Sequence, residues 1–129
     1  MKQIFLDTNI VLRYLLGEND APKIAKLLKS HETLIIPDIV VAEVVWTLGR
    51  FYKWPKEKTA QFLFVLLKNK NIEFNENIIF PTLSTFLKYN IRYTDAYISV
   101  IMKQSKTKDI YSFDEDFDKI PEVNRLEPK

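Results

Sequence analysis

Two acidic residues, Asp7 and Asp114, each come directly after a segment with the composition of a β-strand. Asp7 follows the apolar run Ile4-Phe5-Leu6, and Asp114 follows the strand-like segment 109–113. In an open α/β sheet, ligands bind beyond the carboxyl ends of the strands. If the two strands are neighbours, both carboxylates lie in one crevice. Ordinary roles remain open, because Asp7 or Asn9 would also cap a helix and the sequence around Asp114 also fits an acidic surface turn.

Glu43 and Asp95 are two further acids in unusual surroundings. Glu43 interrupts the apolar, helix-like run 39–46, and a buried carboxylate is costly unless it is paired or bound to a metal. Its ordinary partner would be Arg50, two turns along the helix. Asp95 has an ordinary interpretation as well, because Thr94 is a good N-cap and an acid in the first turn complements the helix dipole.

Taken together, Asp7, Glu43, Asp95 and Asp114 form a set of oxygen ligands without histidine or cysteine nearby. Such a set favours Mg²⁺ or Mn²⁺. An ion of this kind activates water for phosphodiester cleavage, and two ions can share one acidic cage. The sequence leaves open whether one or two ions are bound. It also leaves open whether Asp114 or the nearby Asp116 is the fourth acid, and Asp114 is preferred because it lies nearer the strand end.

Composition excludes several other kinds of site. The chain of 129 residues has no cysteine, so disulfides, zinc–thiolate sites and thiol catalysis are excluded. It has only two glycines and no glycine-rich phosphate loop. No stretch approaches the roughly 20 apolar residues of a membrane helix, and the N-terminus does not resemble a signal peptide. A soluble, cytoplasmic protein is therefore expected.

The net charge of +2 conceals a more basic surface if the four acids share one site. The remaining molecule would then carry 19 basic and 13 acidic residues, a net charge of +6. An acidic pocket on a basic surface suits a phosphate polymer held around a metal ion.

Apolar periodicity predicts alternating strands and helices, and therefore a parallel sheet covered on both faces. Strands are predicted at 3–6, 33–36, 72–74, 109–113 and 123–126. Helices are predicted at 9–16, 21–29, 38–53, 55–69 and 94–106, with a further helix before the last that ends at residue 89. Pro81 leaves the start of the fifth helix open. One domain covering residues 1–129 is expected.

The motifs in this order resemble the PIN-domain family of metal-dependent ribonucleases, and within it the VapC-type toxins of type II toxin–antitoxin systems. The motifs that carry the resemblance are Asp7-Thr8-Asn9, Val41-Ala42-Glu43, Tyr93-Thr94-Asp95-Ala96 and Ser112-Phe113-Asp114-Glu115-Asp116-Phe117. The resemblance implies a three-layer α/β/α sandwich with a parallel sheet of about five strands in the order 3-2-1-4-5.

The resemblance also implies roles for these residues. Mg²⁺ or Mn²⁺ would be held by Asp7, Glu43, Asp95 and Asp114. Thr8 and Ser112 would orient the carboxylates through hydrogen bonds, as outer partners of a metal site commonly do. Asn9 would have a structural role at the turn, and Asp116 remains the substitute for Asp114.

The function implied by the resemblance is that of an endoribonuclease toxin with a cognate antitoxin protein as partner, acting as a homodimer on RNA. The alternative is a non-enzymatic module with the PIN fold that binds RNA or protein only. A receiver domain is disfavoured because the first strand ends in a single acid. A haloacid-dehalogenase phosphatase is disfavoured because Asp-x-Asp is replaced by Asp7-Thr8-Asn9.

Two helices have more apolar residues than a single buried stripe requires. The run 62–67 is apolar throughout, and the helix that contains Trp46 has a similar excess. Surplus apolar surface of this kind marks an interaction site when it remains open to solvent. The two helices could instead bury this surplus completely against each other in a helical hairpin. The resemblance to VapC-type toxins implies an open groove for the antitoxin around Trp46, Phe51, Phe62 and Leu66.

Overall fold

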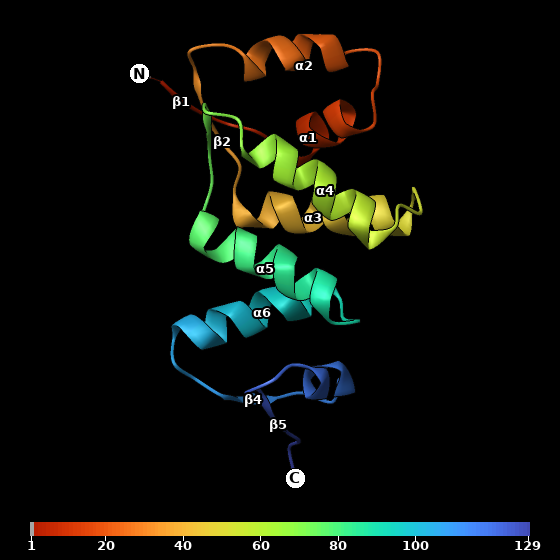
Figure 1. Cartoon of the computed structure of the whole chain (residues 1–129), viewed down its shortest axis with the longest axis vertical. Coiled ribbons are helices and arrows are strands. Elements are labelled where there is room, and N and C mark those ends of the chain that lie inside the picture. The colour runs from red at the N-terminus through yellow and green to blue at the C-terminus, as the bar shows by residue number, and fades with distance from the viewer. Residues whose placement is uncertain (1) are drawn as a thin grey trace. The chain divides into compact units, whose positions relative to one another are not determined.

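The computed structural model describes residues 2–129. The chain divides into two compact units, Met1–Asn75 and Glu76–Lys129. Both combine helices with parallel strands, as Figure 1 shows. Among residues 2–129, no helix combines the length and the apolar character required to cross a bilayer.

The first unit has a three-stranded parallel sheet in the order β1-β2-β3. In this register Phe5 lies opposite Ile35, and Leu34 lies opposite Ile72. The elements of this unit are β1 (Gln3–Phe5), α1 (Thr8–Leu15), α2 (Ala21–Leu28), β2 (Thr33–Ile35), α3 (Asp38–Arg50), α4 (Lys56–Leu67) and β3 (Ile72–Glu73). Each parallel connection contains at least one helix, as such a crossover requires.

The core of the first unit is built from the inward faces of α1, α3 and α4 around β2. Leu34 of β2, Val44 and Leu48 of α3 are fully buried. The apolar run before Asp7 is typical of a buried strand, but all three residues of β1 are exposed. The buried side chain of this segment is Leu6, just beyond the strand.

The second unit has a two-stranded parallel sheet, β4-β5, with Ile110 opposite Arg125. Its elements are α5 (Glu76–Lys88), α6 (Tyr93–Gln104), β4 (Asp109–Tyr111), the 3₁₀ turn η1 (Glu115–Lys119) and β5 (Asn124–Leu126). The two helices lie side by side (Figure 1). Ile79 and Leu83 of α5 and Ala96 of α6 are fully buried.

Pro81 lies inside α5 rather than at its start. A proline in a helix interior removes the hydrogen bond to the carbonyl four residues earlier, which here belongs to Asn77. The Gln104 side chain, at the end of α6, donates a hydrogen bond of 2.7 Å to that carbonyl. The helix therefore continues through Pro81 because its neighbour provides the missing donor.

The predicted elements are confirmed in type and order, with boundaries shifted by a few residues. The strand orders found within the two sheets agree with the corresponding parts of the order 3-2-1-4-5, whereas adjacency of β1 and β4 stays a prediction. Asp38 and Thr94 are residue types that make good N-caps, but both already lie within their helices. The caps of α3 and α6 are Pro37 and Arg92, which have extended backbone while the next residue is helical.

Candidate metal centre

Asp95 is a buried carboxylate in the first turn of α6. The backbone of Arg92 is extended, at φ −73° and ψ 155°, and the helix begins at Tyr93. This start places Asp95 on the inner face of the helix, where its residue exposure is 2%. Burial at this level is costly for a charged group unless a partner compensates it.

Asp114 and Asp116 are positioned by the turn that follows β4. The Ser112 hydroxyl accepts a hydrogen bond of 2.9 Å from the backbone N–H of Asp114. A carboxylate oxygen of Asp114 accepts one of 2.9 Å from the N–H of Asp116 and so caps η1. Ser112 therefore acts on the backbone of this turn, and not directly on a carboxylate as the family resemblance implies.

Arg92, which was not among the residues predicted from the sequence, connects the acid of α6 with the turn after β4. Its Nε lies 3.2 Å from one oxygen of Asp95, and its Nη2 lies 3.3 Å from the other. The same Nη2 donates to Asp114 at 3.0 Å. An arginine three residues before an acid in a helix start was the available signal, since that spacing brings side chains together.

The pKa values of the two bridged acids are shifted in opposite directions. Burial raises the pKa of the Asp95 carboxyl, an effect that the Arg92 guanidinium opposes and the Asp114 carboxylate reinforces. The pKa of the Asp114 carboxyl is lowered, first by the hydrogen bond from the Asp116 backbone N–H and then by Arg92. A further cation near Asp95 would favour its charged form.

One oxygen from each of Asp95, Asp114 and Asp116 lies within 4.8 Å of the other two. Because Mg²⁺–oxygen distances are about 2.0–2.1 Å, two ligands of one ion are at most about 4.2 Å apart. The three oxygens therefore need only small side-chain adjustments to bind one cation. The Lys119 ammonium lies 2.8 Å from Asp116, and Arg92 pairs with Asp95 and Asp114, so all three acids have a basic partner.

Asp7 belongs to the first unit and caps α1. Its carboxylate accepts a hydrogen bond of 2.7 Å from the backbone N–H of Thr8. The expected orienting group was the Thr8 hydroxyl, and the contact found uses the backbone instead. Asn9 lies in the first turn of α1 and is exposed, as is Asp7.

Glu43 also belongs to the first unit, and the expectation that it is buried is wrong. It is exposed on α3, whereas Val44 and Val45 beside it are buried. Among residues 2–129, neither Arg50 nor another basic residue forms an ion pair with it. The structure thus brings Asp95, Asp114 and Asp116 together, while the inclusion of Asp7 and Glu43 stays a prediction.

Comparison with known proteins gives a consistent assignment. The PIN domain family model matches residues 4–123. The chain is similar to a VapC ribonuclease of Aquifex aeolicus (strain VF5), with 27% identity over 122 residues that cover 89% of this chain and 90% of the relative.

Two solved structures also align with the chain. VapBC2 from Rickettsia felis, bound to a DNA fragment from its promoter, has 18% identity and a TM-score of 0.43, covering 99% of this chain and 100% of the other. Mycobacterium tuberculosis VapC20, a toxin that cleaves the sarcin–ricin loop, has 16% identity and a TM-score of 0.43, with coverages of 89% and 92%.

The family model spans both compact units and includes every acid considered above. The match extends from β1 almost to β5, so it includes the strands and helices on which these acids lie. The chain belongs to the PIN domain family.

Proposed function

We propose that this protein is a metal-dependent endoribonuclease that acts as the toxin of a toxin–antitoxin pair. The observation that carries the proposal is the cluster of Asp95, Asp114 and Asp116, in which one buried and two half-buried carboxylates converge. The similarity to a protein named VapC ribonuclease supports RNA as the substrate.

The residues of the cluster have separable tasks in this proposal. Asp95, Asp114 and Asp116 would hold the cation, and Asp7 and Glu43 would complete the ligand set. A bound Mg²⁺ or Mn²⁺ supplies the charge that activates water and stabilises the developing charge on the phosphate. Arg92 holds Asp95 and Asp114 in position through a forked set of hydrogen bonds.

The deciding experiment is cleavage of RNA by the purified protein with Mg²⁺, with Mn²⁺ and with EDTA. Cleavage within the strand in the presence of either ion, and its loss in EDTA, is expected. Binding of RNA without cleavage under every metal condition would contradict the enzyme and favour the alternative, a PIN-fold binding module.

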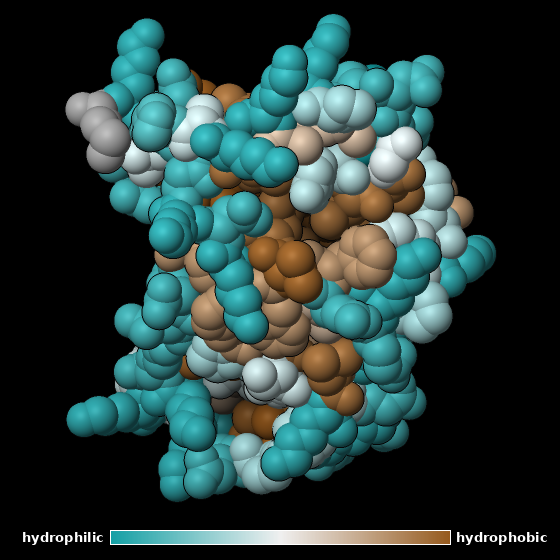
Figure 2. All heavy atoms as spheres, turned by 45° about the horizontal axis from the view of Figure 1, so that its top comes forward, coloured by the Kyte–Doolittle hydropathy of each residue, from teal (hydrophilic) through white to brown (hydrophobic). Residues whose placement is uncertain are grey.

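The proposed partner surface lies on α3, α4 and the turn between them, in the first unit. Figure 2 shows apolar side chains at the surface among mostly hydrophilic ones. We define the aromatic face by its exposed large residues, which are Ile39, Trp46, Phe51, Tyr52, Phe62 and Val65. The rings of Trp46 and Phe51 meet edge to face, with their centroids 5.3 Å apart.

An apolar surface of this extent suits a protein partner, and we propose that it receives the antitoxin. The similarity to a VapC ribonuclease supports that partner. Leu66 was expected to belong to this surface, but it is only 3% exposed and packs inward. A homodimer remains part of the proposal, and light scattering tests it: a monomer at micromolar concentration would contradict it.

A further inference from the structure

A cavity of about 540 Å³ lies within the second unit, separate from the carboxylate cluster. Its wall includes Lys88, Lys103, Lys106 and Lys108, opposed by one acid, Glu122. We call it the lysine cavity. Among residues 2–129, none of these four lysines forms an ion pair with a carboxylate. The cavity wall is therefore strongly positive.

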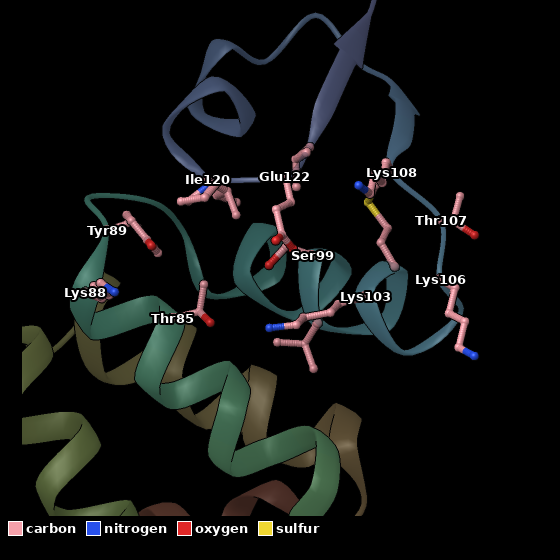
Figure 3. A pocket seen from close by; sticks show the side chains of 14 residues that line it. Thr85, Lys88, Tyr89, Ser99, Lys103, Lys106, Thr107, Lys108, Ile120 and Glu122 are labelled. Carbon is pink, nitrogen blue, oxygen red and sulfur yellow. The ribbon is translucent and has the colours of Figure 1, made fainter.

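The lining of the lysine cavity is not uniformly polar. Val100 and Ile120 are buried and contribute an apolar wall, and the ring of Tyr89 stands at one side. Figure 3 shows Lys103 on α6 and Lys108 on the segment leading to β4, on different sides of the hollow. An apolar wall with an aromatic ring and a basic rim matches a nucleotide, which has a flat base and an anionic phosphate.

The backbone around the lysine cavity adopts an uncommon conformation. Three non-glycine residues of the described chain have left-handed backbone, and two of them, Lys106 at φ 57° and Glu122 at φ 70°, line this cavity. Lys106 stands just after α6, where the N–H of Thr107 bonds the Met102 carbonyl at 2.9 Å. Glycine is the usual residue at this point of such a helix end, so a lysine there adopts a backbone conformation that costs free energy.

The position of the lysine cavity relative to the acids is set by α6. Asp95 lies in the first turn of this helix and Lys103 in its last. Eight residues at 1.5 Å each place their backbones about 12 Å apart along the helix axis. This axial separation corresponds to a few nucleotides of an extended RNA strand.

We propose that the lysine cavity binds one nucleotide of the RNA substrate outside the cleaved bond, with its base against the apolar wall and its phosphate among the lysines. This inference rests on the proposed ribonuclease function. The cavity then contributes affinity and position along the strand, while the carboxylates carry the chemistry.

The first test measures binding of a fluorescent single-stranded RNA by anisotropy in EDTA, over a range of salt concentrations. Lys103→Gln combined with Lys108→Gln should lower affinity and reduce the salt dependence by about 0.7 in log–log slope, the value for one phosphate contact on a single strand. The matched control is Lys23→Gln with Lys26→Gln, which removes the same charge from exposed positions of α2. Equal losses in both double variants would overturn the proposal.

Two single variants sharpen the assignment. Glu122→Gln removes the opposing charge and should tighten RNA binding. Lys106→Gly should raise the melting temperature, since glycine accepts the left-handed backbone, and yet weaken RNA binding. A melting temperature that rises with unchanged affinity would assign Lys106 a structural role alone and count against the cavity.

A competition experiment separates a nucleotide site from a general phosphate site. A nucleoside monophosphate should displace the RNA at lower concentration than inorganic phosphate does, because it adds the base contact. Equal potency would overturn the nucleotide assignment.

Cleavage assays keep this inference distinct from the proposed function. The double lysine variant should show a raised KM and an unchanged kcat with Mg²⁺. If the parent protein cuts RNA but this variant has the parent's KM, the cavity proposal fails alone. If the parent does not cut RNA under any metal condition, the ribonuclease function fails first.

Discussion

At the scale of single residues, the centre combines charges that would repel one another without Arg92. Asp95 has almost no contact with solvent, and Asp114 lies beside it. The guanidinium of Arg92 reaches both, although its own side chain is 69% exposed. An exposed arginine can change its rotamer at low cost, so the same residue can neutralise the acids and still leave room for a cation.

The variant Asp95→Asn should reduce RNA cleavage by on the order of 100-fold or more, because it removes the buried charge that a divalent cation would bind. The matched control is Glu115→Gln, which alters an exposed acid of the same acidic stretch outside the cluster. Rates measured with saturating Mg²⁺ check this. Equal rates for parent and Asp95→Asn would show that the centre has been misassigned.

The variant Arg92→Gln should lower the free energy of unfolding in EDTA by about 1–2 kcal/mol, since a hydrogen-bonded charge is lost beside a buried carboxylate. Chemical denaturation measures it. Arg92→Lys keeps the charge but loses the fork, and should recover only part of the loss. Full stability in Arg92→Gln would contradict a bridging role.

At the scale of elements, a neighbouring helix can supply a hydrogen bond that a helix cannot form by itself. Helix α5 continues through Pro81 because α6 provides a donor to the Asn77 carbonyl. Helices α3 and α4 have more apolar residues than their own unit buries. Leu48 of α3 and Leu63 of α4 are buried on the inner faces of these helices. Trp46 of α3 and Val65 of α4 are 60% and 68% exposed.

Pro81 and Gln104 should be energetically coupled. In the parent, Gln104→Ala leaves the Asn77 carbonyl without its protein donor, and in a Pro81→Ala background the restored backbone N–H replaces that donor. A double-mutant cycle in urea should give a coupling of about 0.5–1 kcal/mol. Additive effects of the two changes would show that the side-chain bond does not substitute for the missing N–H.

The aromatic face should bind the antitoxin without contributing to the stability of the protein alone. Phe51→Lys and Val65→Lys each change an exposed position, so each should leave the melting temperature nearly unchanged and weaken antitoxin binding. The comparison variant is Leu87→Lys, at an exposed position of α5 in the other unit. Calorimetric titration with the product of the neighbouring gene measures the effect, and undiminished binding by both variants would exclude this face.

At the scale of the whole molecule, one family model covers both compact units, and the proposed ligands are divided between them. Asp7 and Glu43 come from the first, and the observed cluster comes from the second. If one cation is held by acids from both, metal binding stabilises the folded chain as a whole.

Mg²⁺ or Mn²⁺ should therefore raise the melting temperature, and EDTA should reverse the effect. A ligand at 100 times its Kd stabilises the folded state by about 2.7 kcal/mol. Asp95→Asn and Asp7→Asn should both reduce the shift measured by calorimetry. A shift that disappears in Asp95→Asn but is unchanged in Asp7→Asn would restrict the site to the second unit.

The sequence by itself determined the type and order of the elements, because apolar periodicity and turn residues act locally. It also placed Asp95 and Asp114 at a helix start and beyond a strand, which is where they converge. Whether an apolar run is buried on every side depends on which partners pack against it. The exposure of Glu43 on α3 was therefore decided by tertiary structure alone.

Long-range contacts decided the remaining features for the same reason. The bridge from Arg92 to Asp114 joins residues 22 apart in sequence, and the bond from Gln104 to Asn77 joins residues 27 apart. The lysine cavity likewise gathers side chains from α5, from α6 and from the segment before β5. A local sequence pattern cannot predict such contacts, because they form only when the helices and strands pack together.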